Sequence, residues 1–337
     1  VNGKDYTVNV VNGKGNVTGV KLAAGSYDFT AKFAGDNNYN AVSDSGKFNV
    51  NKVDSAIDVA VSDIKVGEDA VISVKLADDA TGEVVITVNG EDYTTAIENG
   101  EATVTVSDLK ADDYTVSVKY AGDNNYNGAT GSAEFSVLKI TPDMDVTVDG
   151  AVFGEDLTVD AVLPADATGE VVITVNGKDY HVAIDNGESV QVVKDLAAGD
   201  YTVVVKYAGD DKYSGVEVTG VVNVAKAQPV LGVVIADVDY GNGFVIEATL
   251  TGVNNAPLNG NVLVAVNSKF YVVNVINGKG TLTGDKLAAD TYGFAAAWTG
   301  NNNYASVTEN GDFKVNKVDS AIDVAVSDIK VGEDAVI

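Results

Sequence analysis

The sequence predicts an all-β fold, in which seven-stranded β-sandwiches follow one another as a tandem, elongated array. Three observations predict it. One motif recurs through the whole chain, which is typical of an array of like domains. Within each repeat, apolar and polar residues alternate in short runs, as they do in strands with one buried face. Turn signals separate these runs, and no helical period occurs anywhere.

The clearest repeat is a Gly-Asp-x-x-Tyr motif. Its tyrosines stand at positions 39, 126, 213 and 304, so the spacings are 87, 87 and 91 residues. The four extra residues of the last spacing fall between Leu250 and Val262, in a surface connection that tolerates insertion. A longer period overlies the short one, because residues 51–72 are identical to residues 316–337 at an offset of 265. We therefore expect one continuous polypeptide that repeats this block beyond both ends.

These periods divide the chain into complete and partial domains. Complete domains are expected at residues 51–138, 139–225 and 226–315. Residues 1–50 correspond to the last four strands of a domain, and residues 316–337 to the first strand and the start of the second. The linkers are short and lack Gly/Ser-rich spacers, so neighbouring domains are expected to be each other's partners in a semi-rigid rod.

The repeat at residues 51–138 shows how the strands are assigned. Apolar residues alternate with polar ones in seven runs, at residues 57–61, 70–76, 84–88, 93–97, 102–106, 114–120 and 133–137. Asn89-Gly90, after the third run, supplies the positive-φ pair of a tight hairpin, and Asn99-Gly100 turns the chain again. Seven short strands in slightly under 100 residues fit the immunoglobulin-like sandwich.

A second repeated mark is a tyrosine that begins the sixth strand. The pattern Leu-x-x-x-x-Tyr occurs four times, ending at Tyr27, Tyr114, Tyr201 and Tyr292. A tyrosine at this place in an immunoglobulin-like sandwich forms a tyrosine corner, with its hydroxyl bonded to nearby backbone. The Gly-Asp-x-x-Tyr motif then falls on the hairpin between strands six and seven, with motif residues Asp36, Tyr39, Asp123, Tyr126, Asp210, Tyr213 and Tyr304.

These motifs resemble the bacterial Ig-like domains of the group 3 type, in which a strand ending in an aromatic residue precedes Gly-Asp-x-x-Tyr, as at residues 119–126. The arginine-free composition, rich in lysine and asparagine, resembles adhesin-like surface proteins of methanogenic archaea. The resemblance covers the whole chain, although in the fourth copy Asn301 replaces the aspartate and Trp298 the preceding aromatic residue. It implies an extracellular, cell-surface location and a stalk or adhesive role, and it implies no catalytic residues.

Composition argues against several classes of function. The formal net charge of −27 repels nucleic acid and anionic lipid, because nucleic-acid affinity comes largely from cationic contacts with phosphate. No apolar run approaches the roughly 20 residues of a membrane-spanning helix, so no membrane insertion is expected in this segment. Without cysteine, and with His181 as the single histidine, the chain holds little material for catalysis. We expect no enzyme.

Acidic residues near one domain junction are candidates for calcium binding. Asp54, Asp58 and Asp63 lie there, with Glu68 and Asp69 close behind. Calcium needs about six to eight oxygens converging on one point, whereas Asp58 and Asp63 have opposite parity along an extended strand. The hairpin aspartates are read as turn residues that cap their own backbone. We therefore expect no metal or other cofactor, with junction calcium as the alternative.

Two functions fit this chain. The first is a structural stalk or fibre shaft of a cell-surface adhesin-like protein, a semi-rigid rod that supports adhesion and whose chains can self-associate into fibres. The alternative is a set of multivalent glycan- or cell-surface-binding modules, whose weak sites would gain avidity from repetition. Exposed aromatic residues would mark the second function, and the repeated hairpin tyrosines are the candidates.

The tyrosine corner gives a direct test. Replacing Tyr114 by phenylalanine should lower the free energy of unfolding by about 0.5–1.5 kcal/mol, the usual net contribution of one hydrogen bond. Chemical denaturation of the isolated repeat at residues 52–138 measures this change. An unchanged midpoint would mean that the hydroxyl bonds to water and that the corner is wrongly placed.

Overall fold

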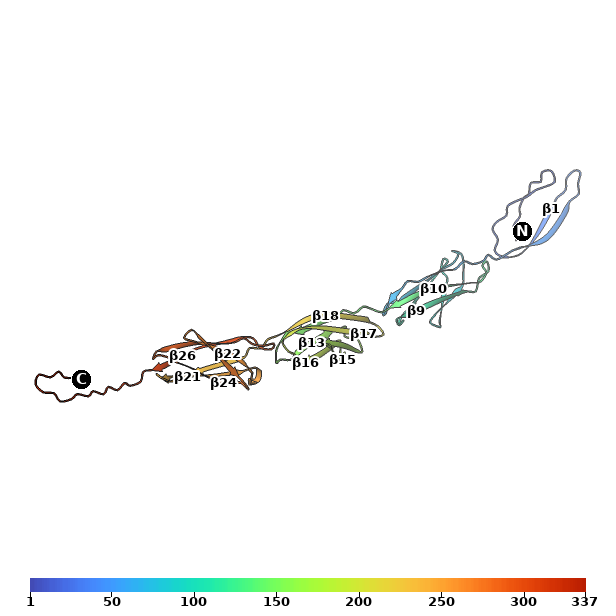
Figure 1. Cartoon of the computed structure of the whole chain (residues 1–337). Helices are drawn as coiled ribbons and strands as arrows, with labels where there is room; N and C mark the ends of the chain where they lie inside the picture. Colours follow the sequence, from blue (N-terminus) through green and yellow to red (C-terminus); the bar gives the residue numbers. More distant parts are fainter. The chain divides into compact units, whose positions relative to one another are not determined.

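The computed structural model describes all residues, Val1–Ile337, and is all-β, with 26 strands and one short 3₁₀ turn. It contains no helix of the length and apolarity needed to cross a membrane. The chain divides into two compact units, residues 1–142 with 209–214 and residues 143–208 with 215–337. One isolated hairpin is followed along the sequence by three complete β-sandwiches (Figure 1).

The first complete sandwich is formed by the repeat at residues 51–138. One sheet has the strand order β3-β5-β8, and the other has the order β4-β10-β9-β6-β7. The strands are β3 (Asp58–Ala60), β4 (Ile64–Lys65), β5 (Ala70–Lys75), β6 (Glu83–Val88), β7 (Glu91–Ala96), β8 (Glu101–Val106), β9 (Asp112–Tyr120) and β10 (Ala129–Leu138). Seven of them match the seven predicted runs, and the predicted immunoglobulin-like sandwich is confirmed.

The alternation in the sequence produces the two faces of each strand. In β6, Val84, Ile86 and Val88 are almost completely buried between the sheets, and the residues between them lie on the outer face. Each such side chain contributes about 1.5–3 kcal/mol by leaving water. The strand ends where Asn89 and Gly90 take φ values of 51° and 82°, the left-handed pair that a tight hairpin requires.

The short strand β4 was not predicted from the sequence, and it determines how the domain is closed. After β3 pairs with β5 in the smaller sheet, the chain crosses to the larger sheet, where β4 runs parallel to β10 with Ile64 beside Val137. The Val66 N–H extends this pairing by donating to the Leu138 carbonyl at 3.0 Å. Two residues are too few to show a strand period, which is why the sequence pattern did not reveal β4.

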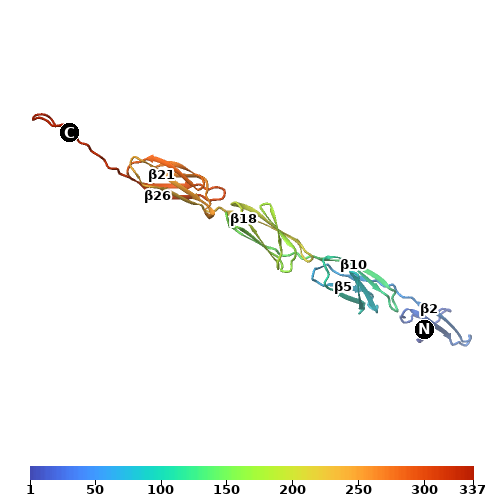
Figure 2. The same cartoon turned by 90° about the horizontal axis from the view of Figure 1, so that it is seen from below.

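The other two complete repeats form the same sandwich. The second comprises β11 (Asp145–Asp149), β12 (Ala151–Val152), β13 (Leu157–Val162), β14 (Glu170–Val175), β15 (Lys178–Ala183), β16 (Glu188–Val193), β17 (Gly199–Gly209) and β18 (Ser214–Ala225). The third comprises β19 (Val230–Ile235), β20 (Val238–Asp239), β21 (Gly243–Thr251), β22 (Gly260–Val266), β23 (Lys269–Val275), β24 (Lys279–Lys286), β25 (Thr291–Trp298) and β26 (Val307–Asn316). Figure 2 shows β21 and β26, which belong to different sheets of the third sandwich.

The insertion in the last repeat lies where the sequence placed it. The loop between β21 and β22 contains the 3₁₀ turn η1 (Val253–Asn255), in which Asn254 and Asn255 have φ values of 53° and 57°. Asparagine tolerates this left-handed backbone better than most residues do. The loop stays at one end of the sandwich, so the strand order is unchanged.

Residues 1–50 form only one hairpin, β1 (Gly25–Phe33) with β2 (Val42–Val50). Four strands were predicted here, and the first two of them do not form; residues 1–24 contain a single isolated bridge, between Val11 and Lys14. In the first complete sandwich the equivalent strands, β7 and β8, pair with β6 and β5. The equivalents of β5 and of all but the last residue of β6 do not lie within residues 1–50, so residues 1–24 pair with neither in this structure.

Two identical segments show the same dependence on partners. Residues 51–72 contribute β3, β4 and the start of β5 to the first complete sandwich. Residues 317–337, whose sequence is identical to that of residues 52–72, contain no strand (Figure 1). They are largely exposed. Ile72 is fully buried, whereas its counterpart Ile337 is 86% exposed. Tertiary pairing, and not local propensity, makes these residues strands.

This pair of isoleucines provides a matched test. Replacing Ile72 by alanine should destabilise the first complete sandwich by about 2–5 kcal/mol, because it leaves a cavity in the core. Replacing Ile337 by alanine should change nothing. Native-state hydrogen exchange of the β5 and β8 amides in the full chain measures both effects. Equal effects of the two substitutions would contradict the assigned burial.

Candidate functional site at the domain junctions

The four corner tyrosines close the loop that precedes their strand. Each hydroxyl donates to the carbonyl oxygen four residues earlier at 2.8–3.2 Å; the donors are Tyr27, Tyr114, Tyr201 and Tyr292. The ring of Tyr114 also stacks on Phe135 of the next strand, with 5.5 Å between the ring centroids. We call the closed segments at residues 22–27, 109–114, 196–201 and 287–292 the corner loops.

The Gly-Asp-x-x-Tyr motifs form the hairpin tips, at residues 35–39, 122–126, 209–213 and 300–304. In every tip the side-chain Oδ1 of the second residue accepts hydrogen bonds from two main-chain N–H groups at 2.7–3.0 Å; the acceptors are Asp36, Asp123, Asp210 and Asn301. A carboxamide oxygen accepts these bonds as well as a carboxylate does. Asn301 therefore preserves the turn despite its departure from the motif.

Asp123 additionally joins two loops of the first complete sandwich. Its Oδ2 accepts from the Thr81 N–H at 2.8 Å and from the Thr81 hydroxyl at 3.0 Å. Burial works against ionisation of Asp123, but the hydrogen bonds from Thr81 and the tip outweigh it and hold the pKa of this carboxyl well below its usual value. Burial, with Asp123 beside it, raises the pKa of Tyr120 to about 12.

The tyrosine that ends each hairpin tip is a packing residue in the complete sandwiches. Tyr213 and Tyr304 are only 5% and 6% exposed, whereas Tyr39, on the hairpin at residues 25–50, is 71% exposed. The Tyr126 hydroxyl donates to Asp79 Oδ1 at 2.5 Å. In the third sandwich the inserted loop supplies the contact, since the Val253 N–H donates to the Tyr304 hydroxyl at 3.2 Å.

The linker that enters each complete sandwich pairs with the hairpin tip of the same sandwich. The sequence did not lead us to predict this contact. The linker lysines Lys52, Lys139 and Lys226 donate from Nζ to the main-chain carbonyl of the second tip residue at 2.5–2.6 Å. The residue after each lysine forms a parallel bridge with the tip tyrosine; the pairs are Val53–Tyr126, Ile140–Tyr213 and Ala227–Tyr304. The three lysines recur every 87 residues, so their repetition in the sequence could have marked them as structural residues.

The hairpin tip also contacts the preceding repeat, and each compact unit contains one such contact. Asn125 Oδ1 accepts from the Ala24 N–H at 3.1 Å, and Asn303 Oδ1 accepts from the Ala198 N–H at 3.1 Å. Ala24 and Ala198 occupy the same position of their corner loops. The two repeated sequence motifs therefore meet at these junctions. Sequence reasoning did not single out these asparagines, although they recur at equivalent motif positions.

Three of the five acidic residues considered for calcium have separate partners. Asp54 accepts from the Asn127 side chain, Asp63 from the Ser136 N–H, and Glu68 from the backbone N–H at position 65. No three or more His, Asp or Glu side chains lie together in a way that could hold a metal ion. These contacts give the carboxylates a structural use at the ends of β4 and β10.

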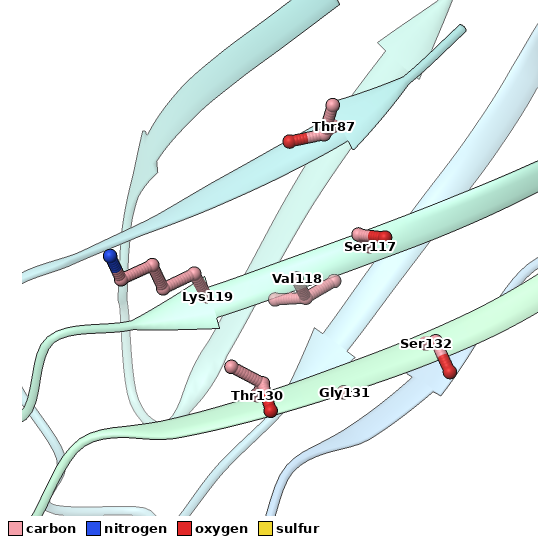
Figure 3. Close-up of a pocket in the computed structure, with 7 residues that line it drawn as sticks. All are labelled: Thr87, Ser117, Val118, Lys119, Thr130, Gly131 and Ser132. Atoms are coloured by element: carbon pink, nitrogen blue, oxygen red, sulfur yellow. The ribbon is translucent and has the colours of Figure 1, made fainter. Parts of the chain in front are cut away.

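A shallow hollow lies on the outer face of the larger sheet in the first complete sandwich (Figure 3). Strands β6, β9 and β10 line it with the hydroxyl groups of Thr87, Ser117, Thr130 and Ser132 and the amine of Lys119. No carboxylate or imidazole is among the lining residues. The hollow offers hydrogen bonds and contains no acid–base pair.

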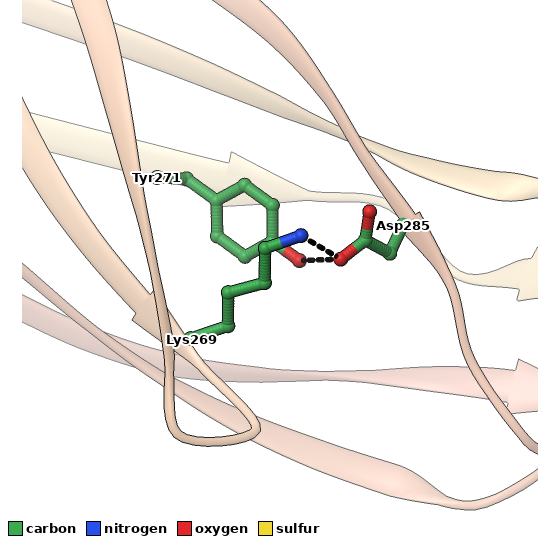
Figure 4. Close-up of polar contacts among 3 residues, drawn as sticks. All are labelled: Lys269, Tyr271 and Asp285. Atoms are coloured by element: carbon green, nitrogen blue, oxygen red, sulfur yellow. Dashed lines mark hydrogen bonds and ion pairs between the residues drawn. The ribbon is translucent and has the colours of Figure 1, made fainter.

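Two other polar clusters are exposed ion pairs. His181 Nδ1 lies 2.8 Å from Glu170 Oε1 on neighbouring strands, and this carboxylate raises the pKa of the imidazole. In the third sandwich, Lys269 and the Tyr271 hydroxyl both bond to Asp285 Oδ2 (Figure 4). The pKa of Lys269 is raised and that of Asp285 lowered, chiefly because they bond to each other. This mutual bonding favours the charged forms of Lys269 and Asp285.

Comparison with known proteins identifies the type of domain. Residues 58–138 match the family model for the bacterial Ig-like domain (group 3). The group 3 resemblance predicted from the hairpin and strand motifs is therefore confirmed for this repeat. No curated protein matches the chain.

Three solved structures that the chain resembles are distant from it in sequence. Titin domains I67–I69, an E-to-A variant, are 13% identical, with 79% of this chain and 99% of that chain covered and a TM-score of 0.35. Sidekick-1 immunoglobulin domains 1–5 are 12% identical, with 92% and 71% covered and a TM-score of 0.31. Bacteroides ovatus SGBP-B, solved with a mixed-linkage heptasaccharide, is 14% identical, with 80% and 72% covered and a TM-score of 0.22.

The Asp123 contacts lead to a prediction about acid stability. Replacing Asp123 by asparagine should destabilise the first complete sandwich by about 1–3 kcal/mol, because Thr81 loses its charged acceptor. Since the folded-state pKa lies below the unfolded one, the contribution of Asp123 is present above the unfolded pKa and is lost as the pH falls through the folded value.

Urea denaturation between pH 2 and pH 7 measures both effects. The wild-type domain should lose stability as the pH falls below about 4, and the variant should show a shallower dependence. Replacing Glu134, an exposed carboxylate on β10, by glutamine is the control and should leave the profile unchanged. Parallel profiles for wild type and the Asp123 variant would contradict the assignment.

Proposed function

We propose that this chain, in which residues 58–138 form a group 3 bacterial Ig-like domain, is a load-bearing stalk segment of a cell-surface adhesin-like protein and not an enzyme. In this role the tandem domains hold a binding region away from the cell or form the shaft of a fibre. The partners of each domain are its neighbours in the chain, and other cells or surface glycans are met elsewhere in the protein.

The parallel pairing between an early strand and the last strand of each domain carries this proposal. In all three complete sandwiches a short early strand runs parallel to the last strand; the pairs are β4–β10, β12–β18 and β20–β26. Tension along the chain enters a domain through its N-terminal strands and leaves through its last strand. When two parallel neighbouring strands are pulled in opposite directions, all the hydrogen bonds between them bear the load in shear at the same time. Such a pair resists separation better than a pair whose hydrogen bonds break one after another.

The junction contacts support the same role. A hairpin tip is tied to its own linker by a lysine and a parallel bridge, and to the preceding corner loop by an asparagine. At the junction in the second compact unit, the ring of Phe153 also packs edge-on against Tyr304, with 5.3 Å between centroids. Such contacts restrict bending at a linker that has no flexible spacer.

The alternative, glycan recognition by the repeated tyrosines, has less support. Tyr213 and Tyr304 are buried, so their rings are not available to stack on a sugar. Tyr126 is half-buried and bonded to Asp79. The repeated motif is used to build the domain and its junction, which favours a structural role.

Stretching the full chain by its ends in a single-molecule force experiment tests the proposal. Replacing Val66 by proline removes the N–H that bonds to Leu138 and should raise the unfolding rate of one domain under load by about five- to tenfold. The other two complete sandwiches should be unaffected. Val66→Ala, which keeps the N–H, is the control for lost packing. An unchanged unfolding force in the proline variant would refute shear loading of this pair.

A further inference from the structure

Part of the outer face of the larger sheet in the third sandwich is apolar. This part comprises exposed and half-buried side chains of β22, β23 and β25, and we call it the apolar face: Leu263, Ala265, Phe270, Val272, Ala295 and Ala297. Phe270, Val272 and Leu263 are 67%, 54% and 43% exposed. Cross-strand register aligns them in two rows, with Leu263 between Val272 and Ala297 and Ala265 between Phe270 and Ala295.

The two rows continue onto β26 without a charge. Thr308 lies beside Ala297, and Asn310 lies beside Ala295. Eight neighbouring surface positions on four strands therefore hold no acidic or basic side chain. This is unusual in a chain with a formal net charge of −27. An exposed apolar patch with a polar border is typical of an interaction site.

The same positions are mostly polar in the rest of the chain, and each other repeat places charged residues among them. In the first complete sandwich they are Val85, Thr87, Asp92, Thr94, Ser117 and Lys119, three of which border the hydroxyl-lined hollow of Figure 3. In the second they are Val172, Thr174, Asp179, His181, Val204 and Lys206. In residues 1–50 the equivalents present are Asp5, Thr7, Thr30 and Lys32. The fold thus tolerates polar residues here, so the apolar set is not needed for folding.

The strand that carries the large side chains of the apolar face is bonded to the other sheet. Phe270 and Val272 lie on β23, the edge strand of the larger sheet. The flanking Lys269 and Tyr271 both bond to Asp285 on β24, which belongs to the other sheet (Figure 4). These contacts fix the edge strand before any partner binds, so less ordering is needed on association.

We propose that the apolar face pairs with the same face of a second copy of this chain. Its shape suits this pairing, because large side chains stand on β22 and β23 and alanines stand on β25. A two-fold axis parallel to the strands places the β23 side of one copy over the β25 side of the other. Phe270 of each copy then packs over the partner's alanines, and each copy uses the same patch.

Charge also favours a second copy as the occupant. Two chains of this acidity repel each other over most of their surfaces, and this repulsion is least where both faces are uncharged. Covering the apolar face with any acidic part of the chain would strip water from carboxylates at a large cost. The uncharged face of another copy avoids both penalties.

The size of the face sets the strength of the contact. Four strands about 4.8 Å apart and two rows of side chains give an area on the order of 300 Å² per copy. A stable interface buries about 800 Å² per partner, so this contact is weak and reversible. Repetition of weak contacts along neighbouring chains would add avidity. The inference does not depend on the load-bearing role, because the parallel strand pairs and junctions take no part in it.

Sedimentation equilibrium of the full chain, from about 5 μM to 1 mM, tests the proposal. We expect a reversible monomer–dimer equilibrium with a dissociation constant on the order of 100 μM. The double variant Phe270→Asp, Ala297→Lys introduces the residues found at the equivalent positions 92 and 119, and it should weaken dimerisation at least tenfold. The gentler Val272→Thr should weaken it less. Thr94→Asp, which adds a charge at the position equivalent to Val272 in the first complete sandwich, should have no effect.

Trp298, the single tryptophan of the chain, is buried on β25, so its fluorescence checks that the third sandwich stays folded in each variant. Added salt should strengthen dimerisation by screening the net charge. A wild-type chain that stays monomeric at 1 mM would overturn the proposal. A dimer that survives the double variant, or that dissociates in 0.5 M salt as an ionic contact would, would also overturn it.

Discussion

The hydrogen bonds between the first segment of each domain and its last strand are the constraint on which the rest of the structure depends. The chain has no cysteine, so no disulfide can close the sandwich. Closure comes instead from β4 crossing to β10, and from its equivalents in the other two complete sandwiches. Once these strands pair, the apolar faces of both sheets are buried against each other. The identical sequence at residues 317–337, without such partners, has no strand.

The same principle extends to the junctions, where one hairpin tip serves three purposes. Its Asp or Asn side chain holds the turn, and its main chain pairs with the linker of its own domain. At two junctions the fourth tip residue, Asn125 or Asn303, also accepts a hydrogen bond from the corner loop of the preceding repeat. Asp123 shows how closely these uses are linked, since its second oxygen binds Thr81 in another loop. The repeated motif therefore has a structural use in the turn, the linker pairing and the junction.

Much of this was predictable from the sequence, and the rest depends on contacts that one repeat cannot reveal. Alternation and Asn-Gly turns predicted seven strands correctly, because burial of one face imposes a period of two. The short β4 escaped because two residues show no period. The linker lysines and Asn125 escaped because their partners are main-chain atoms about 70 or more residues away. The apolar face of the third sandwich became recognisable only when register placed Phe270, Leu263 and Ala297 beside one another.

Hydrogen exchange of the polypeptide of residues 1–337 tests the central claim most directly. The claim is that pairing with distant strands, and not local sequence, gives residues 51–72 their strands. Residues 51–72 and 316–337 have the same sequence, and peptides that extend into their differing neighbours can be told apart by mass. The amides of Val53 and Val66, which donate to the hairpin tip and to β10, should be protected by orders of magnitude over those of Val318 and Val331. Equal exchange in the two segments would contradict this account.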